Sequence, residues 1–324
     1  MNDYRHLPKP VVIVADDLTG ACDCALQFRR RRARALVHVD SAALREPPND
    51  VHAFSTDSRN LEPSRTASRI QQIAQQILPR AVEPPLIFKK IDSLLRGNPG
   101  PEIMAAMDAF GAGLGVIAPA FPEMGRTIVD GRLSVRANYT WEPIELPRFL
   151  RNQGLTECRH IHPGAIADAI AGGATLISVD TACHEDFRII ITEVLCCGRK
   201  TLWAGSGGLA SALATELVPQ PMPKALRPVG ARPVLFCVGS QHSATAAQLE
   251  KLKRDRPLCD FTVHTATGPA LTSALEQGRH AILRLDVADP DAHRVRDLLL
   301  GVAGRTEAIF ISGGDTVSVF CRAV

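Results

Sequence analysis

The ten-residue segment VVIVADDLTG, from Val11 to Gly20, restricts the fold of this chain more than any other stretch. Its run of small apolar residues, most of them β-branched, predicts a strand buried on both faces, and such strands form parallel sheets that helices cover on both sides. The strand ends at Asp16 and Asp17, where open α/β sheets bind their ligands. One carboxylate would suffice to cap the helix expected from about Ala21, so a pair of them favours a binding site over a cap.

Composition limits the class of protein. A chain of 324 residues is long enough for two domains, and its 45% hydrophobic and 22% charged residues are ordinary for an α/β protein. The 37 basic and 34 acidic residues leave a formal net charge of +3, which argues against nucleic-acid and membrane partners. The polar N-terminus has no signal-peptide core, so a cytoplasmic protein is expected. Nine cysteines without zinc-finger spacing predict reduced core thiols and no structural metal.

Strand and helix patterns alternate along the chain, which predicts parallel sheets. After the first helix, the expected elements include strands at 34–40, 51–59, 86–92 and 174–180 and a helix at 64–78. The proline-rich segment from Val218 to Pro233 is the best candidate for a domain boundary. We therefore expect an α/β protein of two three-layer α/β/α domains, a larger one at residues 1–222 and a smaller one at 230–324.

A second group of charged residues follows the strand expected at 86–92. Strand alternation puts Lys90 and Asp92 on one face, and Ser93 and Arg96 lie on the loop that opens the next helix. A lysine, an arginine, a serine and the backbone N–H groups of a helix N-terminus together suit an anion, because Arg offers a carboxylate or phosphate two parallel hydrogen bonds. The alternative is a solvated loop with a surface salt bridge.

A third strand end repeats the pattern. The segment from Gly115 to Leu133 reads as a buried strand followed by a loop, rich in Pro and Gly, that carries Glu123 and Arg126. Because parallel strands end at the same edge of a sheet, all three strand ends are expected to meet there. A polyhydroxylated acid would suit this set, with basic groups on its carboxylate and aspartates accepting hydrogen bonds from its hydroxyls.

Two glycine-rich turns are weaker indications of a nucleotide- or phosphate-binding site. The run from Gly205 to Gly208 resembles part of a dinucleotide-binding fingerprint, but no acidic residue follows on a strand about 20 positions later, so we interpret it as a tight turn with close helix packing. The turn from Gly313 to Thr316 follows a buried strand and would let backbone amides approach phosphates, although an ordinary turn fits equally. The HIH sequence at 160–162 alternates like an exposed strand and needs no metal.

The segments ADDLTGACDCA, KKIDSLLRGN, APAFPEMGRT, VGSQHSAT and ISGGDT, in this order, resemble the four-carbon acid sugar kinase family, two-domain bacterial enzymes that phosphorylate threonate, erythronate and related acids with ATP. The resemblance implies an N-terminal domain that binds the sugar acid and a C-terminal domain that binds ATP. The implied acid-binding residues are Asp16, Asp17, Lys90, Asp92, Ser93, Arg96 and Arg126. The implied nucleotide-binding residues are Ser240, His242, Gly313, Gly314, Asp315 and Thr316. Asp16 or Asp17 would orient or deprotonate the hydroxyl, with Mg²⁺ neutralising the phosphates.

The chain departs from the family pattern at several points. Leu94 stands where a threonine is usual, His242 stands where the second serine of the turn is usual, and the loop after Gly131 lacks the usual pattern. The chain also ends at Val324, before the further glycine-rich segment expected to close over the nucleotide. A family member that binds an acid sugar without phosphorylating it is therefore the alternative, and a nicotinamide-dependent dehydrogenase is a weaker one. The acid, the hydroxyl and the existence of a homo-oligomer are left open.

Overall fold

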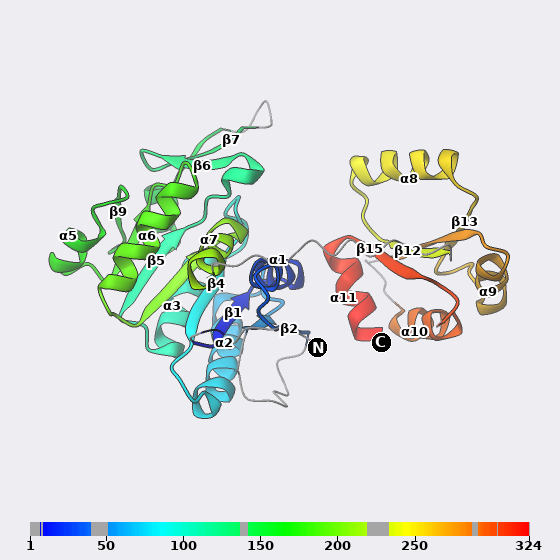
Figure 1. The fold of residues 1–324 in the computed structure, drawn as a ribbon, viewed down its shortest axis with the longest axis horizontal. Helices are drawn as coiled ribbons and strands as arrows, with labels where there is room; N and C mark the ends of the chain where they lie inside the picture. The colour runs from blue at the N-terminus through cyan, green and yellow to red at the C-terminus, as the bar shows by residue number, and fades with distance from the viewer. Residues whose placement is uncertain are drawn as a thin grey trace. The chain divides into compact units, whose positions relative to one another are not determined.

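The structure is a computed structural model that describes residues 7, 9–39, 51–136, 142–218, 233–286, 291–302 and 304–323. The chain divides into two compact units, Met1–Pro223 and Lys224–Val324 (Figure 1). Each unit has a parallel sheet flanked by helices, which confirms the predicted α/β class. No helix in the described ranges is long and apolar enough to span a membrane.

An eight-stranded parallel sheet is the centre of the first unit, with the strand order β2-β3-β1-β4-β11-β5-β10-β9. Its strands are β1 (Val11–Ala15), β2 (Ala35–His38), β3 (Val51–Ser55), β4 (Leu86–Lys90), β5 (Leu114–Ala118), β9 (Arg159–Ile161), β10 (Leu176–Val179) and β11 (Thr201–Gly205). All five residues of β1 are fully buried, as a central strand covered on both faces requires.

Helices cover both faces of this sheet (Figure 1). The helices are α1 (Leu18–Arg29), α2 (Pro63–Ile77), α3 (Pro99–Phe110), α4 (Leu146–Asn152), α5 (Ile166–Ala171), α6 (His184–Cys196) and α7 (Gly207–Leu217), with short 3₁₀ turns η1 (Leu78–Arg80) and η2 (Pro122–Met124). Helix α2 packs on α3, and α7 packs on both α1 and α6. In α2 the residues Ile70, Ile73 and Ile77 recur at helical spacing and are fully buried, so this stripe joins α2 to the core.

Helix α1 begins at Leu18, three residues before the expected start at Ala21. Asp17 has extended backbone angles and its Oδ1 accepts a hydrogen bond from Gly20 N at 2.7 Å, so it is the N-cap. Thr19 and Gly20 therefore belong to the first helical turn.

The segment after β5 holds a hairpin where a loop was expected. Strands β6 (Arg126–Val129), β7 (Arg132–Val135) and β8 (Ile144–Glu145) form a small antiparallel sheet. Its turn is Asp130-Gly131, with φ of 48° and 72°. Both residues lie in the left-handed region that a two-residue hairpin turn demands, so the Asp-Gly pair was a signal for this hairpin that the prediction of a loop overlooked.

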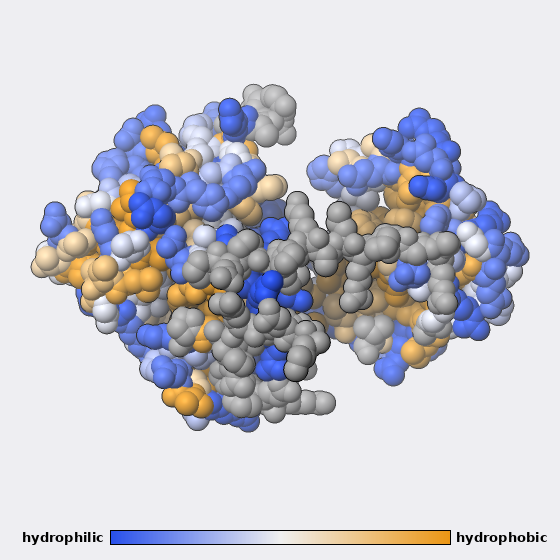
Figure 2. Space-filling view, in the orientation of Figure 1, coloured by the Kyte–Doolittle hydropathy of each residue, from blue (hydrophilic) through white to orange (hydrophobic). Residues whose placement is uncertain are grey.

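The second unit is built on a four-stranded parallel sheet with the order β13-β14-β12-β15. Its elements are β12 (Val234–Val238), α8 (Ser243–Asp255), β13 (Leu258–Thr262), α9 (Gly268–Glu276), β14 (His280–Arg284), α10 (Ala292–Gly301), β15 (Ala308–Ser312) and α11 (Gly314–Ala323). Figure 2 shows hydrophilic residues over α8, whose single buried residue is Leu249.

All nine cysteines lie in the described ranges, and none of them forms a disulfide. Cys24 and Cys237 are buried as predicted for core thiols, and burial raises the pKa of Cys237 to about 12. Cys22, Cys183 and Cys196 are exposed, so for them the expected core position is wrong. The two buried thiols are protonated at neutral pH and are poor nucleophiles.

Candidate functional site

A cavity of about 670 Å³ opens where strands of the large sheet end, which is within the roughly 300–1,000 Å³ typical of small-molecule sites. It is lined by Asp17, Thr19, Gly20, Asp23, Gln27, Arg30, Arg59, Lys90, Asp92, Ser93, Arg96, Phe121, Glu123, Met124, Arg126, Ser206, Gly207 and Ser211. Charged side chains of both signs line it, so the cavity suits a ligand that has both an anionic group and hydroxyls.

The cavity brings together six of the seven residues expected to contact a sugar acid. Those six are Asp17, Lys90, Asp92, Ser93, Arg96 and Arg126, and they come from the three strand ends that the sequence singled out. The seventh, Asp16, does not line the cavity and is 2% exposed. The two neighbouring aspartates therefore differ in their access to a ligand.

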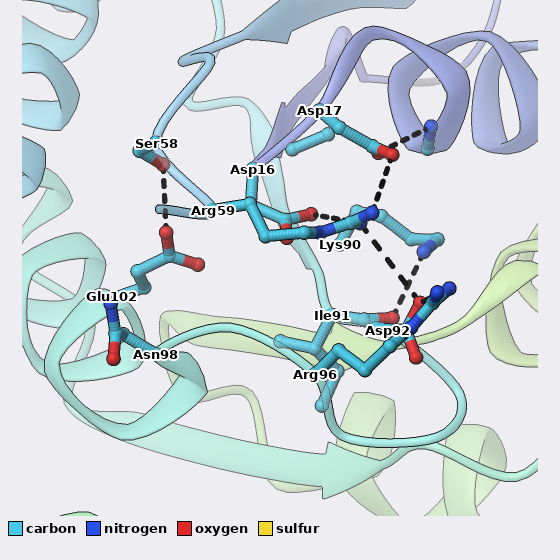
Figure 3. Close-up of polar contacts among 12 residues, drawn as sticks. Asp16, Asp17, Ser58, Arg59, Lys90, Ile91, Asp92, Arg96, Asn98 and Glu102 are labelled. Atoms are coloured by element: carbon cyan, nitrogen blue, oxygen red, sulfur yellow. Dashed lines mark hydrogen bonds and ion pairs between the residues drawn. The ribbon is translucent and has the colours of Figure 1, made fainter. Parts of the chain in front are cut away.

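The guanidinium of Arg59 lies among the carboxylates of three aspartates, Asp16, Asp17 and Asp92 (Figure 3). Its Nε donates to Asp16 Oδ2 at 2.7 Å, its Nη1 lies 2.9 Å from Asp17 Oδ2, and its Nη2 lies 4.0 Å from Asp92 Oδ2. Sequence reasoning missed this residue and treated it only as the end of the strand expected at 51–59. The available signal was the polar sequence TDSR directly after a buried strand, which is the same pattern that marks the other strand ends.

The pKa values in this cluster follow from these contacts. Burial alone would lower the pKa of Arg59, but the hydrogen bond to Asp16 and the charges of Asp16, Asp17 and Asp92 outweigh burial and raise it. Burial likewise opposes ionisation of Asp92, yet hydrogen bonds from Arg96 Nη2 and Leu94 N lower its pKa. Arg59 is therefore a fixed cation and Asp92 a fixed anion at neutral pH.

Three cations of the cavity, Arg30, Lys90 and Arg126, have no carboxylate partner within ion-pair distance among the described residues, and Arg30 donates from Nη1 to Gln27 Oε1 at 3.2 Å. Lys90, 6% exposed, donates from Nζ to Ile91 O at 3.0 Å. Arg126 donates from Nη1 to Ser93 Oγ, and its Nε is buried without a hydrogen-bond partner. Because a buried donor without a partner is costly, a ligand that accepts from Arg126 would be favoured.

The backbone contributes further positive potential. Helices α1 and α7 both begin at the cavity, with Asp17 capping the first and Ser206 Oγ accepting from Gly208 N at 3.1 Å in the second. The N-terminal ends of helices carry partial positive charge and attract anions. At Gly20 a Cβ atom would lie 2.6 Å from Asp17 Oδ1 and 3.3 Å from Lys90 Nζ, so only glycine leaves room for the lysine here.

The interpretation of Gly205 to Gly208 as close packing is confirmed. A Cβ atom at Gly205 would lie 2.7 Å from Ala118 O, and one at Gly208 would lie 2.6 Å from Ala120 O. These glycines are needed because the turn after β11 passes against the end of β5, so they give no support to a dinucleotide site.

In the second unit, the two turns expected to face a nucleotide contact each other. Gly239 N donates to Thr316 Oγ1 at 3.0 Å, and a Cβ atom at Gly313 would lie 2.7 Å from the same oxygen and 3.3 Å from Ser240 N. His242 is the N-cap of α8, its Nδ1 accepting from Ala244 N at 3.1 Å. The histidine therefore takes the capping position that a serine would fill.

Among the residues that the structure describes, one group of three side chains outside the cavity could hold a metal ion, namely Asp130, His162 and Asp180. Asp180 already accepts hydrogen bonds from Asp130 N and Gly131 N, both at 2.9 Å, and its oxygens lie 2.9 Å from His160 Nε2 and His162 Nδ1. The carboxylate thus holds the β6–β7 turn against the end of β10, which accounts for its burial without an ion.

Comparisons of this chain with known proteins point to one family. A family model described as "Sugar-binding N-terminal domain" matches residues 11–213. A D-threonate kinase of Cupriavidus necator is 29% identical over 367 aligned positions, which cover 96% of this chain and 85% of that protein. A D-erythronate kinase of Heliobacterium modesticaldum is 28% identical, over 78% of this chain and 62% of that protein. The chain belongs to the four-carbon acid sugar kinase family.

Solved structures share the fold of this four-carbon acid sugar kinase family member. A Bordetella bronchiseptica protein described as a domain of unknown function, crystallised with bound citrate as a domain-swapped dimer, is 28% identical with a TM-score of 0.54, over 97% of this chain and 85% of that one. A Haemophilus influenzae protein reaches a TM-score of 0.72 at 20% identity, over 97% of this chain and 88% of that one, which supports the fold alone.

Proposed function

We propose that this protein is an ATP-dependent kinase that phosphorylates a hydroxyl of a small sugar acid bound in the cavity of the first unit. The observation that carries the proposal is the buried Nε of Arg126, which has no hydrogen-bond partner, while Nη1 of the same side chain donates to Ser93 Oγ. A carboxylate would accept from the Ser93 hydroxyl and from Arg126 and Lys90, two of the cavity cations that have no acidic partner among the described residues. The family relatives named as threonate and erythronate kinases act on acids of this class.

The remaining polar groups suit the hydroxyls of such an acid. The side chain of Asp17 is 27% exposed, lines the cavity and keeps an ion pair with Arg59, so its carboxylate can accept a hydrogen bond from a hydroxyl. Asp92 and Glu123 offer further acceptors. We assign to Asp17 the orientation or deprotonation of the reacting hydroxyl, and to Asp16 the support of Arg59.

The turns of the second unit fit the phosphates of ATP. Gly313, with φ of 110°, leaves open the space that a Cβ atom would fill between Ser240 N and Thr316 Oγ1. Helices α8 and α11 begin at these turns, beside the ends of the neighbouring strands β12 and β15. Asp315 is the carboxylate of this turn that would help to hold Mg²⁺, which would neutralise the charge of the phosphates.

The assay that tests the proposal combines turnover with binding. Purified protein should consume ATP with Mg²⁺ in the presence of threonate, erythronate or a related four-carbon acid, and the acid alone should raise the Tm. Arg126→Met should abolish the acid-induced shift, whereas Arg132→Met, on an exposed arginine of the same hairpin, should preserve it. A shift with acid but no ATP consumption would favour an acid-binding protein without kinase activity, and no shift with any acid would contradict the proposal.

A homodimer is part of the proposal. The 28% identical Bordetella bronchiseptica protein is described as a domain-swapped dimer with bound citrate. Size-exclusion chromatography with light scattering on the full chain would measure the mass directly. A monomer at micromolar concentration would remove the dimer from the proposal and leave the assigned activity unchanged.

A further inference from the structure

A buried ion pair lies beneath the cavity. Lys89, on β4, is 0% exposed, and its Nζ lies 2.9 Å from Oε2 of Glu102, which belongs to the first turn of α3 and is 2% exposed. Neither residue lines the cavity. A buried ion pair adds little to stability, because the cost of removing both charges from water offsets their attraction. Its presence therefore calls for another explanation.

Each member of the pair is linked to one cation of the cavity. Lys89 contacts the backbone of Lys90, and Glu102 contacts the residue that precedes Arg59. Lys89 Nζ also donates to Lys90 O at 2.8 Å, and so holds the peptide of the cation that follows it. Glu102 Oε1 accepts from Ser58 Oγ at 2.8 Å, and Ser58 directly precedes Arg59 (Figure 3). One pair of charges is thus connected to two of the residues that define the cavity, Lys90 and Arg59.

The loop that carries Arg59 needs such support. Asp57 has a φ of 46°, in the left-handed region that non-glycine residues rarely adopt. On either side of it, Thr56 Oγ1 and Ser58 Oγ are 2.6 Å apart, and Ser58 N donates to Asp16 O at 2.9 Å. Within this set of contacts, the bond from Ser58 to Glu102 is the one that ties the loop to α3. Arg69 on α2 also donates to Thr56 O and Asp57 O, so losing the bond to Glu102 would loosen the loop without releasing it, and the Arg59 backbone would shift relative to Asp17.

We propose that the Lys89–Glu102 pair, acting through Ser58, is a positioning element for substrate binding that sets the places of Arg59 and Lys90. The inference rests on the proposed function, since it assumes that the cavity binds the sugar acid. It explains why charges are kept where apolar residues of similar size would be at least as stable. Misplacing a binding group by about 1 Å can cost up to about a hundredfold in rate.

The decisive variant replaces both charges at once. Lys89→Met with Glu102→Leu removes the pair without leaving an unpaired buried charge, so the Tm should stay the same or rise. The KM for the acid should nevertheless increase about ten- to a hundredfold, with a smaller acid-induced Tm shift. The matched control is Glu185→Gln with Arg188→Gln, which removes an exposed pair on α6 and should leave the KM of the wild type.

A second set of variants tests the route through Ser58. Ser58→Ala should raise the KM for the acid and Ser58→Thr, which keeps the hydroxyl, should restore it. If the double variant does not fold, the comparison of Ser58→Ala with Ser58→Thr tests the inference by itself. An unchanged KM in the folded double variant, or equal KM values in Ser58→Ala and the wild type, would overturn the inference. Failure of the wild type to bind any sugar acid would instead count against the proposed function, so the two failures are distinguishable.

Discussion

Arg59 donates from Nε and Nη2 to the two carboxylate oxygens of Asp16, at 2.7 and 3.2 Å, while its Nη1 lies 2.9 Å from the neighbouring Asp17. One guanidinium thus holds two adjacent carboxylates of very different exposure, 3% for the side chain of Asp16 and 27% for that of Asp17. The two aspartates of the DDLTG segment therefore have separable roles.

We predict that Asp17→Asn lowers kcat by about 10²–10⁴-fold with little change in unfolding free energy, because asparagine is an equally good N-cap but a poor base. Asp16→Asn should instead lower the free energy of unfolding by about 2–3 kcal/mol, less than a fully buried pair would, because Arg59 is partly exposed. Urea denaturation and steady-state kinetics measure both. Asp108→Asn, on an exposed site of α3, is the control, and equal kinetic loss in both aspartate variants would contradict the division of roles.

Gly20→Ala should damage the cavity through sterics alone. The added Cβ would lie 2.6 Å from Asp17 Oδ1 and 3.1 Å from Lys90 Cγ, so the cap or the lysine must move. We expect a loss of about 1–3 kcal/mol in unfolding free energy and a reduced acid-induced Tm shift. Gly268→Ala, where nothing lies within 4 Å, should be neutral or slightly stabilising. Equal behaviour of the two variants in differential scanning fluorimetry would refute this reading of Gly20.

The strand ends were predictable because each apolar run stops at a charged residue, and parallel strands end at one edge of a sheet. That argument was sufficient to gather Asp17, Lys90, Asp92 and Arg126 around one cavity. It did not find Arg59, because the strand that ends at Ser55 was expected to run to residue 59, so the polar TDSR segment was not recognised as a strand end. What the sequence could not show is that Arg59 pairs with Asp16, 43 residues away, because the strand order β3-β1-β4 makes these loops neighbours and local patterns carry no information about that order.

The difference between Asp16 and Asp17 was equally beyond the sequence. Adjacent residues after a strand can point to either side of the sheet edge, and here the first points toward Arg59 and the second caps α1. The Lys89–Glu102 pair was hidden for the same reason. Strand alternation puts Lys89 on the face opposite to Lys90, but the identity of its partner depends on how α3 packs.

His52 predicts a pH dependence of stability. Its side chain is 1% exposed, its Nδ1 lies 2.9 Å from His38 Nε2, and burial, with smaller effects of His38 and Arg34, lowers its pKa from 6.5 to about 4. Between these two pH values the unfolded chain binds a proton that the folded chain does not, so the free energy of unfolding should fall as pH falls from 6.5 towards 4.

The measurement is urea denaturation at several pH values, followed by tryptophan fluorescence, because both tryptophans, Trp141 and Trp203, belong to the first unit. His52→Gln should remove part of the acid-side loss, so the difference between wild type and variant should be largest near neutral pH and shrink towards pH 4. His264→Gln, on an exposed residue of the second unit, should leave the wild-type slope. Parallel curves for the wild type and His52→Gln would exclude the effect.

Variants of Thr316 test the proposed ATP site separately from the proposed acid site. Its side chain is fully buried, and its Oγ1 accepts from Gly239 N at 3.0 Å, which holds the turn after β12 against the turn after β15. Thr316→Val keeps the shape but removes the acceptor, at a cost of about 1 kcal/mol, and the KM for ATP should rise about tenfold. Thr316→Ser should restore it. Thr272→Val, which removes a comparable hydrogen bond to Gly301 O in the same unit, is the matched control. The acid-induced Tm shift should be unchanged in all three variants, because the residues proposed to bind the acid belong to the first unit. A Thr316→Val variant in which only the KM for the acid rises would mean that this turn does not bind the nucleotide.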